Sequence, residues 1–460
     1  MLHPIIYEML SKIIGQVERL ALRLEPRRAI RLLGAMPLAA MEAVQRARFR
    51  ETLRLAAERS PFYREEFRNR GIDLRHVNHP SELGDFFTTS EDLRSRPDDF
   101  LLAHADTAFE TTGTTSPVPK RVFFSREEIE EMARASAVAL SLLGLSRDDI
   151  VLSAFDCSFW VSPAVVRSAL QYIGCFHVEA GKIDPADFYE RASSYRPTVI
   201  FGEPSWIIRL SAIAAERSVW PVKFLLAGGE NISECARAEV EAIWNAPLYL
   251  NYGQTESFGS MGIECRERQG YHRNDLHFIF EVADPDSDGV GELVYTTLTR
   301  EVMPLIRYRS SDLTRLIEEP CACGLFAKRI GKIRARVDEM VVCGMGNVGP
   351  WVFAELLRDV KGPGADWQAV VKHHGTLDLV ELHVELPSFG SRREVERALL
   401  LNLRERFADF WKNYQMKLYD FRVIPCLPGS LRNSRKLKRV VDERLVSTTI
   451  SADHEFALPQ

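Results

Sequence analysis

The sequence predicts an α/β protein with a large N-terminal domain and a small α+β C-terminal domain. Between about residues 150 and 250, short apolar runs alternate with helix-length segments, which is typical of βαβ units and a largely parallel sheet. From 278 to 316 the helical periodicity disappears and Asp288-Gly289 marks a hairpin, so a small antiparallel β subdomain is expected at about 278–330. After about residue 341 the order becomes strand, strand, helix, strand.

These patterns place layered α/β sheets and the β subdomain in residues 1–337, and the α+β domain in residues 338–460. With 460 residues, of which 46% are apolar, the chain can bury more than one core.

An amphipathic helix opens the chain at residues 1–24, and its charged residues argue against a signal peptide or a membrane span. Further on, Ser125 and Glu128 form a capping box at the start of a helix, after a short apolar run at 121–124. The other helices are expected at 41–67, 90–95, 205–217, 233–245 and 392–410. The other strands are expected at 150–152, 198–201, 224–227, 247–250, 291–296, 368–373, 378–386 and 417–424.

The charge balance limits the classes of partner. The 59 basic and 64 acidic residues give a net charge of -5, which argues against general binding of nucleic acid or anionic membranes. Small-molecule partners are therefore expected. The 8 cysteines, without an export signal, are expected to be reduced thiols or metal ligands in a cytoplasmic protein.

Residues 111–120 combine small hydroxyl residues with a glycine and contribute little to a core. Their N–H and O–H donors are accessible to a polyanion, so a triphosphate is the expected ligand. No Gly-Lys-Ser/Thr opens a helix here, which places the loop outside the P-loop class. A mobile surface linker is the alternative interpretation. The residues expected to bind phosphate are Thr111, Thr112, Gly113, Thr114 and Thr115.

Two polar motifs follow predicted strands at the carboxyl edge of the parallel sheet, where ligands of such folds bind. Gly228 and Gly229 permit close approach of a planar ring, and Tyr252 offers a stacking face. Thr255 offers a phosphate donor and Glu256 a hard oxygen ligand for Mg²⁺. An ordinary turn and a loop anchor are the alternatives. The residues assigned to this nucleotide site are Gly228, Gly229, Glu230, Asn251, Tyr252, Gly253, Thr255 and Glu256.

In this order the motifs resemble those of the adenylate-forming superfamily, which includes acyl-CoA synthetases, firefly luciferase and the adenylation domains of peptide synthetases. The chain is most similar to the phenylacetate-CoA ligase branch, over about residues 41–445. Residues 291–298 and 304–312 match a strand of this branch and its ribose-binding aspartate, here Asp312. The resemblance implies activation of a carboxylic acid by ATP and Mg²⁺ to an acyl-adenylate. A thiol, with coenzyme A as the expected co-substrate, then displaces AMP.

The resemblance also assigns roles near the C-terminus. Residues 336–340 match the hinge motif, so Asp338 is expected to be the hinge of a mobile small domain. Arg336 is expected to bind ribose or phosphate, with an interdomain salt bridge as the alternative. Lys436, in a basic run at 428–439, is the candidate catalytic cation beside Thr255 and Glu256, and a solvated tail is the alternative for that run.

Several residues depart from the family pattern. They are Ser116 for the second glycine of the loop, one extra residue before Lys120, Ser311 for the glycine before Asp312, Glu339 for aspartate and Arg435 for glycine. Because Ser116-Pro117 stiffens the loop, slower or more specialised adenylation is expected. A CoA ligase is the first hypothesis. The alternatives are an enzyme that loads a carrier protein or adenylates another acceptor, and a weakened relative that serves as a binding protein; a homodimer is left open.

A second site is predicted from cysteine spacing. Cys321 and Cys323 lie close enough in sequence to bind one metal, and Cys265 with His272 could complete a tetrahedral set. An incidental Cys-x-Cys is the alternative. The branch has corresponding cysteine and histidine residues, so the resemblance implies a structural Zn²⁺.

The acyl pocket is expected, by the same resemblance, at residues 155–160 and 203–206. Aromatic side chains there suit an aryl or otherwise apolar acid, although they could equally be core residues. Asp156 and Ser158 are polar and therefore disfavour phenylacetate itself. The residues expected to line the pocket are Phe155, Phe159, Trp160 and Trp206.

Overall fold

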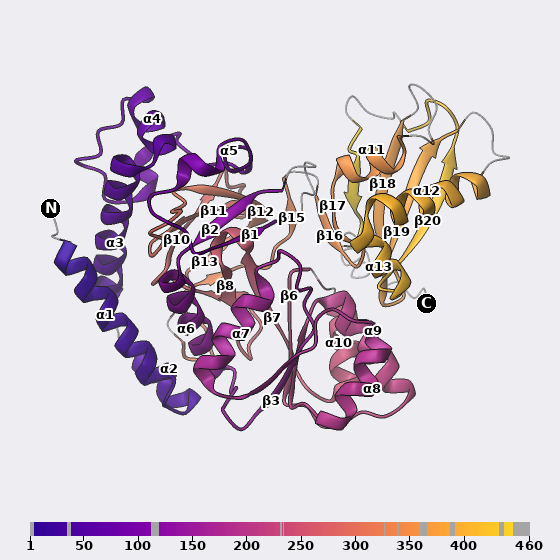
Figure 1. Ribbon diagram of the computed structural model, residues 1–460, viewed down its shortest axis with the longest axis horizontal. Coiled ribbons are helices and arrows are strands. Elements are labelled where there is room, and N and C mark those ends of the chain that lie inside the picture. The colour runs from indigo at the N-terminus through magenta and orange to yellow at the C-terminus, as the bar shows by residue number, and fades with distance from the viewer. Residues whose placement is uncertain are drawn as a thin grey trace, which may run out of the picture.

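The computed structural model has two units, which Figure 1 shows side by side. It describes residues 4–34, 38–111, 119–230, 232, 234–325, 327–337, 340–358, 360, 366–386, 392–431 and 437–444. The larger unit carries the N-terminus, and the smaller one, orange to yellow in Figure 1, follows β15 (Ala335–Arg336). Among the described residues, no helix has both the length and the hydropathy needed to cross a bilayer.

A nine-stranded sheet forms the centre of the large unit. Its parallel half contains, in spatial order, β4 (Phe176–Glu179), β3 (Ile150–Ser153), β5 (Val199–Gly202), β6 (Phe224–Gly228) and β7 (Leu248–Gln254). The antiparallel half continues from β7 through β8 (Gly259–Ile263), β9 (Tyr271–Arg273), β14 (Arg329–Ile330) and β13 (Leu316–Ile317). β5 is buried along its whole length, as expected for a central parallel strand.

Helices join and cover these strands. They are α6 (Arg126–Leu142), α7 (Ser162–Ile173), α8 (Pro185–Tyr195), α9 (Pro204–Glu216) and α10 (Glu234–Trp244). The expected capping box starts α6, because the Ser125 hydroxyl accepts from Glu128 N–H while the Glu128 carboxylate accepts from Ser125 N–H. The hairpin of β1 (Thr107–Glu110) and β2 (Arg121–Phe124) precedes this helix.

The N-terminal helices are α1 (Pro4–Ala21), α2 (Pro26–Gly34), α3 (Leu38–Arg59), α4 (Pro61–Asn69) and α5 (Ser90–Ser95). In Figure 1, α1 and α2 run along the left side of the large unit, and α1 packs on α3 and α6. The single helix expected at 41–67 is two helices, α3 and α4, which are separated at Ser60; the Ser60 hydroxyl accepts from Tyr63 N–H at the start of α4.

The antiparallel subdomain differs in extent from its prediction. A four-stranded sheet orders β10 (Phe278–Ala283), β11 (Gly291–Thr297), β12 (Tyr308–Thr314) and β15. β13 and β14 fall inside the predicted range of 278–330, but they join the nine-stranded sheet, because β14 pairs with β9. The subdomain therefore ends at β15, and it brings Asp312 opposite Arg336 in register.

The small unit has its own hydrophobic core, formed by residues between Val341 and Val440. A hairpin of β16 (Val341–Cys343) and β17 (Gly346–Val348) leads into α11 (Pro350–Leu356). A four-stranded sheet then orders β20 (Tyr419–Cys426), β19 (Leu377–Glu385), β18 (Trp367–His374) and β21 (Val440–Asp442). We propose the domain boundary at residues 337 and 338, as this separate core supports; Asp338 itself lies outside the described residues.

The single helix expected at 392–410 is two helices, α12 (Arg392–Arg406) and α13 (Ala408–Gln415). Phe407 interrupts them with φ of -134° and ψ of 70°. Its ring stacks on Phe410 with centroids 5.4 Å apart and contacts Trp351 at the same distance. Aromatic packing between elements thus overrides the local helical pattern.

Candidate active site

A cavity of about 320 Å³ lies beyond the carboxyl ends of the parallel strands and is lined by both units. The small unit contributes residues of β16, β17 and β21, together with Met340 and Lys438. The predicted nucleotide residues that line the cavity are Thr111, Gly228, Gly229, Glu230, Asn251, Tyr252, Gly253, Thr255, Glu256, Asp312 and Arg336. The predicted residues Thr112, Gly113, Thr114, Thr115, Asp338 and Lys436 lie outside the described residues.

Asp312 on β12 is held by three donors. Its Oδ2 accepts hydrogen bonds from Tyr252 Oη at 2.7 Å and Gln254 Nε2 at 2.9 Å. Its Oδ1 accepts from Arg336 Nη1 at 2.6 Å. Burial and the charge of Asp312 raise the pKa of the Tyr252 phenol well above its usual value, so it remains a donor. The carboxylate is therefore fixed at the cavity wall.

The residue before Asp312 is a serine where the family pattern has glycine, and its backbone adopts the conformation that favours glycine. Ser311 has a φ of 66°, in the left-handed region that favours glycine. A serine there costs about 1 kcal/mol relative to glycine, by the steric penalty of a left-handed L-residue. Its backbone N–H donates to Glu292 Oε1 at 2.8 Å, which helps to hold this conformation.

Glu256, in the short helix η3 (Thr255–Ser257), is buried beside a lysine. Lys120 Nζ forms an ion pair with Glu256 Oε1, which also accepts from Tyr308 Oη at 2.9 Å. Burial alone would raise the pKa of Glu256, but the charge of Lys120 outweighs this and lowers the pKa. Burial alone would lower the pKa of Lys120, and the Glu256 charge instead raises it. Both groups are therefore charged near neutral pH.

Sequence reasoning assigned no role to Lys120, Tyr308 or Ser90. Lys120 ends the hydroxyl-rich loop, and its Nζ donates to Ser90 Oγ at 3.3 Å and Tyr308 Oη at 3.2 Å. The position of Lys120 at the end of the loop is a sequence signal that could have indicated a role in the site. Its contacts with Ser90 and Tyr308 span 30 and 188 residues, so they leave no local pattern in the sequence.

The strand β7 is longer than predicted. The apolar run at 247–250 continues to Gln254, because β8 pairs antiparallel with the extension. Asn251, Tyr252 and Gly253 are therefore strand residues. A Cβ on Gly253 would lie 1.9 Å from the Gly259 carbonyl oxygen, so the close strand contact requires glycine there.

Gly228 ends β6, and Gly229 after it faces a ring of the protein itself. Gly229 has a φ of 90°, and a Cβ there would lie 3.3 Å from the Trp160 ring. Glu230 lines the cavity, but its carboxylate accepts from Ser205 N at 2.9 Å and Ser205 Oγ at 3.0 Å in the first turn of α9. Burial, followed by the charge of Glu203, raises the pKa of Glu230 to about 8. In this structure Glu230 therefore caps a helix.

The apolar side chains of the cavity lining correct two pocket predictions. Phe155 and Trp160 line the cavity, with ring centroids 6.0 Å apart. Phe159, in contrast, is 76% exposed. Trp206 is fully buried in the core, where Nε1 donates to Ile183 O at 2.9 Å and the ring packs edge-on against Phe188. These two residues are outside the cavity, because one faces solvent and the other fills the space under α9.

The polar residues that disfavoured phenylacetate also lie outside the cavity lining. Asp156 Oδ1 accepts from Ser158 N at 2.9 Å and Ser158 Oγ at 2.6 Å. Asp156 Oδ2 accepts from Lys412 Nζ of the small unit at 3.2 Å. Asp156 thus connects the two units, and the sequence-based objection to an aryl-acetate does not hold.

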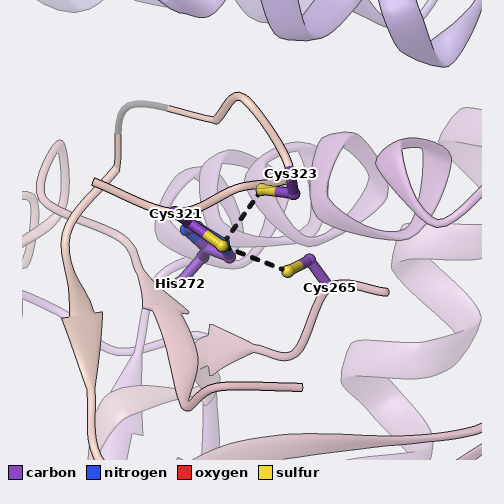
Figure 2. A group of neighbouring side chains, drawn as sticks. All are labelled: Cys265, His272, Cys321 and Cys323. Atoms are coloured by element: carbon purple, nitrogen blue, oxygen red, sulfur yellow. Dashed lines mark hydrogen bonds between the residues drawn. The ribbon is translucent and has the colours of Figure 1, made fainter. Parts of the chain in front are cut away.

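The four predicted metal ligands converge at one point, as Figure 2 shows. The ligand atoms of Cys265, His272, Cys321 and Cys323 all lie within 4.8 Å of one another. His272 Nδ1 lies 2.8 Å from Ala327 O, a contact that leaves Nε2 facing Cys323 Sγ at 3.3 Å. Burial and neighbouring thiols raise the pKa of Cys265 to about 12, while burial lowers that of His272.

Two backbone N–H groups also donate to this cluster. Glu267 N donates to Cys265 Sγ at 3.4 Å, and Leu325 N donates to Cys323 Sγ at 3.3 Å. Such donors stabilise thiolates around a cation. Three sulfurs and one neutral imidazole nitrogen fit a tetrahedral zinc site.

Fold and site together define an AMP-binding enzyme, and comparisons with known proteins agree. Residues 101–279 match the family model described as AMP-binding enzyme. A phenylacetate-coenzyme A ligase from Thermus thermophilus is 30% identical over 444 residues, which cover 90% of this chain and 98% of the relative. A ligase of the same name from Pseudomonas putida is 26% identical over 77% of this chain and 84% of its own length. The chain therefore belongs to the phenylacetate-coenzyme A ligase family and is an AMP-forming acid–thiol ligase.

Solved structures of one more distant protein share the fold. A 2-hydroxyisobutyryl-CoA ligase, in complex with 2-HIB-AMP and CoA in the thioesterification state, gives a TM-score of 0.75 at 22% identity, with 90% of this chain and 92% of that chain covered. The same ligase in the postadenylation state with 2-HIB-AMP gives a TM-score of 0.61 over 89% and 91% of the two chains at 22% identity.

Proposed function

We propose that this enzyme activates an aryl or otherwise apolar carboxylic acid with ATP and transfers the acyl group to coenzyme A. The observation that carries the proposal is one cavity that both polar and apolar side chains line. Thr111, Glu256 and the Asp312–Arg336 pair belong to its polar lining, and Phe155 and Trp160 belong to its apolar lining. A nucleotide and an apolar acid therefore meet in one space.

We assign roles from this arrangement. Asp312 accepts hydrogen bonds from ribose hydroxyls, with Arg336 beside it for the ribose or a phosphate. Thr111 and Lys120 lie at the two ends of the hydroxyl-rich loop, which binds the phosphates. Glu256 holds Mg²⁺, which supplies charge neutralisation for the transferring phosphoryl oxygens when it is bound. Lys436 supplies the second positive charge as the substrate carboxylate approaches the α-phosphate.

We further propose that the small unit moves about Asp338 between the two steps. The higher TM-score against the thioesterification state supports an arrangement suited to the second step here. Asp156–Lys412 joins the units in this arrangement, with side chains 25% and 44% exposed. At Gly344 the packing is close, since a Cβ would lie 3.2 Å from Ser205 Cβ of the large unit.

Lys412→Ala is expected to slow thioester formation by up to about fivefold, because an exposed ion pair contributes about 0.2–1 kcal/mol. Acid-dependent pyrophosphate exchange should be unchanged. The comparison is rapid mixing of a chemically prepared acyl-adenylate with CoA. Lys372→Ala, which breaks an ion pair with Glu381 within the small unit, is the matched control. Equal slowing of both half-reactions by Lys412→Ala would contradict the proposed role.

A structural Zn²⁺ at Cys265, His272, Cys321 and Cys323 is the second part of the proposal, and it ties β9 to the segment after β13. Loss of an outer-shell partner typically weakens metal binding by about 10–100-fold. Cys321→Ser removes a direct ligand and should therefore weaken zinc binding by more than that. Metal analysis of purified protein, with thermal unfolding, measures this. Cys157→Ser removes an exposed thiol outside the cluster and should retain zinc. Unchanged zinc content in Cys321→Ser would count against the site.

The acceptor is tested by AMP release from zinc-replete enzyme with ATP, Mg²⁺ and a panel of acids that includes phenylacetate, aryl acids and aliphatic acids. CoA should increase AMP release with at least one apolar acid and yield the matching thioester. A carrier protein that replaces CoA as the productive acceptor would move the function to carrier loading. Absence of AMP with every acid would indicate a weakened, non-catalytic relative.

A further inference from the structure

The chain places its own cation on the carboxylate assigned to the metal. Glu256 is 3% exposed, and the oxygen Oε1 receives both the Lys120 ammonium and the Tyr308 hydroxyl. The backbone of Glu256 is also fixed, because Arg300 Nη1 donates to its carbonyl oxygen at 3.0 Å. A rigid, buried carboxylate thus has a lysine where a divalent cation would bind.

Lys120 is held in this position from more than one side. Its ammonium donates to Ser90 Oγ at 3.3 Å and to Tyr308 Oη at 3.2 Å, and it lies over the Tyr308 ring at 5.9 Å. The Lys120 backbone is tied to Thr111, whose N–H donates to Lys120 O at 3.0 Å. The side chain, however, has four rotatable bonds, so the ammonium can move while the backbone stays in place.

Electrostatics makes the two cations alternatives. A lysine and a divalent cation on one carboxylate oxygen would lie within a few ångströms of each other in a weakly screening site, where like charges repel strongly. The buried carboxylate in turn requires a cation at all times. Lys120 can leave Glu256 only when a metal takes its place and another anion takes Lys120. A triphosphate beside Thr111 is such an anion.

We propose that Lys120 is a resident counterion that closes the Glu256 metal site until a nucleotide arrives. Divalent cation and triphosphate then bind as a linked pair, and the metal alone is excluded. The inference rests on the proposed function in taking Glu256 as the metal ligand. It makes Lys120 a positioning residue that couples the two ligands.

The test is a titration of nucleotide-free, zinc-replete protein with Mn²⁺, followed by the electron paramagnetic resonance signal of the free ion. Wild-type enzyme should bind Mn²⁺ at this site only weakly, and its affinity is the reference for the variants. Lys120→Met should bind one Mn²⁺ per chain at least about tenfold more tightly, which is a typical coupling between linked sites. Lys120→Gln, which retains length and polarity, serves if the methionine variant does not fold.

Two controls locate the metal. Adding Glu256→Gln to Lys120→Met should remove the new site. Lys223→Met, which breaks a partly exposed ion pair with Asp149, should behave as wild type. Wild-type protein that binds Mn²⁺ without nucleotide as tightly as Lys120→Met would overturn the inference.

The inference and the proposed function fail separately. An enzyme that forms AMP with an acid and also binds Mn²⁺ alone would overturn only the counterion role. An enzyme inactive with every acid, but with the expected difference between wild type and Lys120→Met, would overturn only the proposed activity.

Discussion

Asp312→Ala is expected to lower kcat/KM for ATP by about 100-fold, since two hydrogen bonds to a charged group contribute about 1.5–3 kcal/mol each, part of which water replaces. The carboxylate is oriented before nucleotide binds by Tyr252, Gln254 and Arg336. Its loss removes the ribose acceptor and leaves Arg336 without this ion pair. Steady-state kinetics with ATP varied at saturating acid measures the effect.

The matched control for this variant is Glu281→Ala. Glu281 lies on β10, is largely buried and pairs with Arg307 at 3.1 Å, and neither residue lines the cavity. Both variants break a carboxylate–arginine pair on the same sheet, so thermal unfolding should show similar destabilisation. Equal loss of kcat/KM in the two variants would mean that Asp312 acts through stability, and the ribose role would be rejected.

Lys436→Ala should lower the rate of adenylation by about 100- to 1,000-fold, the loss typical of removing one group that stabilises charge in a transition state. ATP affinity should change little, because the lysine is assigned to the charge that develops as two anions meet. Acid-dependent pyrophosphate exchange gives the rate, and equilibrium binding of ATP gives the affinity.

A prepared acyl-adenylate separates the two steps for this variant. With CoA it should react at near the wild-type rate, because pyrophosphate has already left. Lys417→Ala removes an exposed lysine of the same domain and should leave both steps unchanged. Loss of ATP binding in Lys436→Ala, with adenylation reduced only in proportion, would assign the lysine a ground-state role instead.

The described residues that the sequence assigned to a nucleotide line one cavity, and strand ends left a local pattern for part of this set. Gly228 ends β6 and Tyr252 lies in β7, and the carboxyl ends of these parallel strands meet at one edge of the sheet. Asp312 lies on β12 of the antiparallel sheet and was assigned through the resemblance. The metal cluster was likewise predicted from residue types and spacing. Sequence therefore located groups whose partners lie on neighbouring strands.

Contacts between distant segments were beyond sequence reasoning. Lys120 and Tyr308 are 188 residues apart, and Lys412 and Asp156 are 256 apart. Trp206 shows the opposite error, because the sequence predicted a pocket residue and the side chain is fully buried in the core. An aromatic residue type suits a core position as well as a pocket wall. Only the three-dimensional packing decides which way such a ring points.

The most direct test of the central claim is acid-dependent exchange of pyrophosphate into ATP, with zinc-replete enzyme, Mg²⁺ and no thiol. Exchange requires that an acyl-adenylate form reversibly in the cavity, and it requires neither CoA nor domain movement to the second state. We predict that at least one aryl or apolar acid supports exchange and that Asp312→Ala greatly reduces it. Exchange with none of the acids, from folded enzyme that binds ATP, would contradict the account.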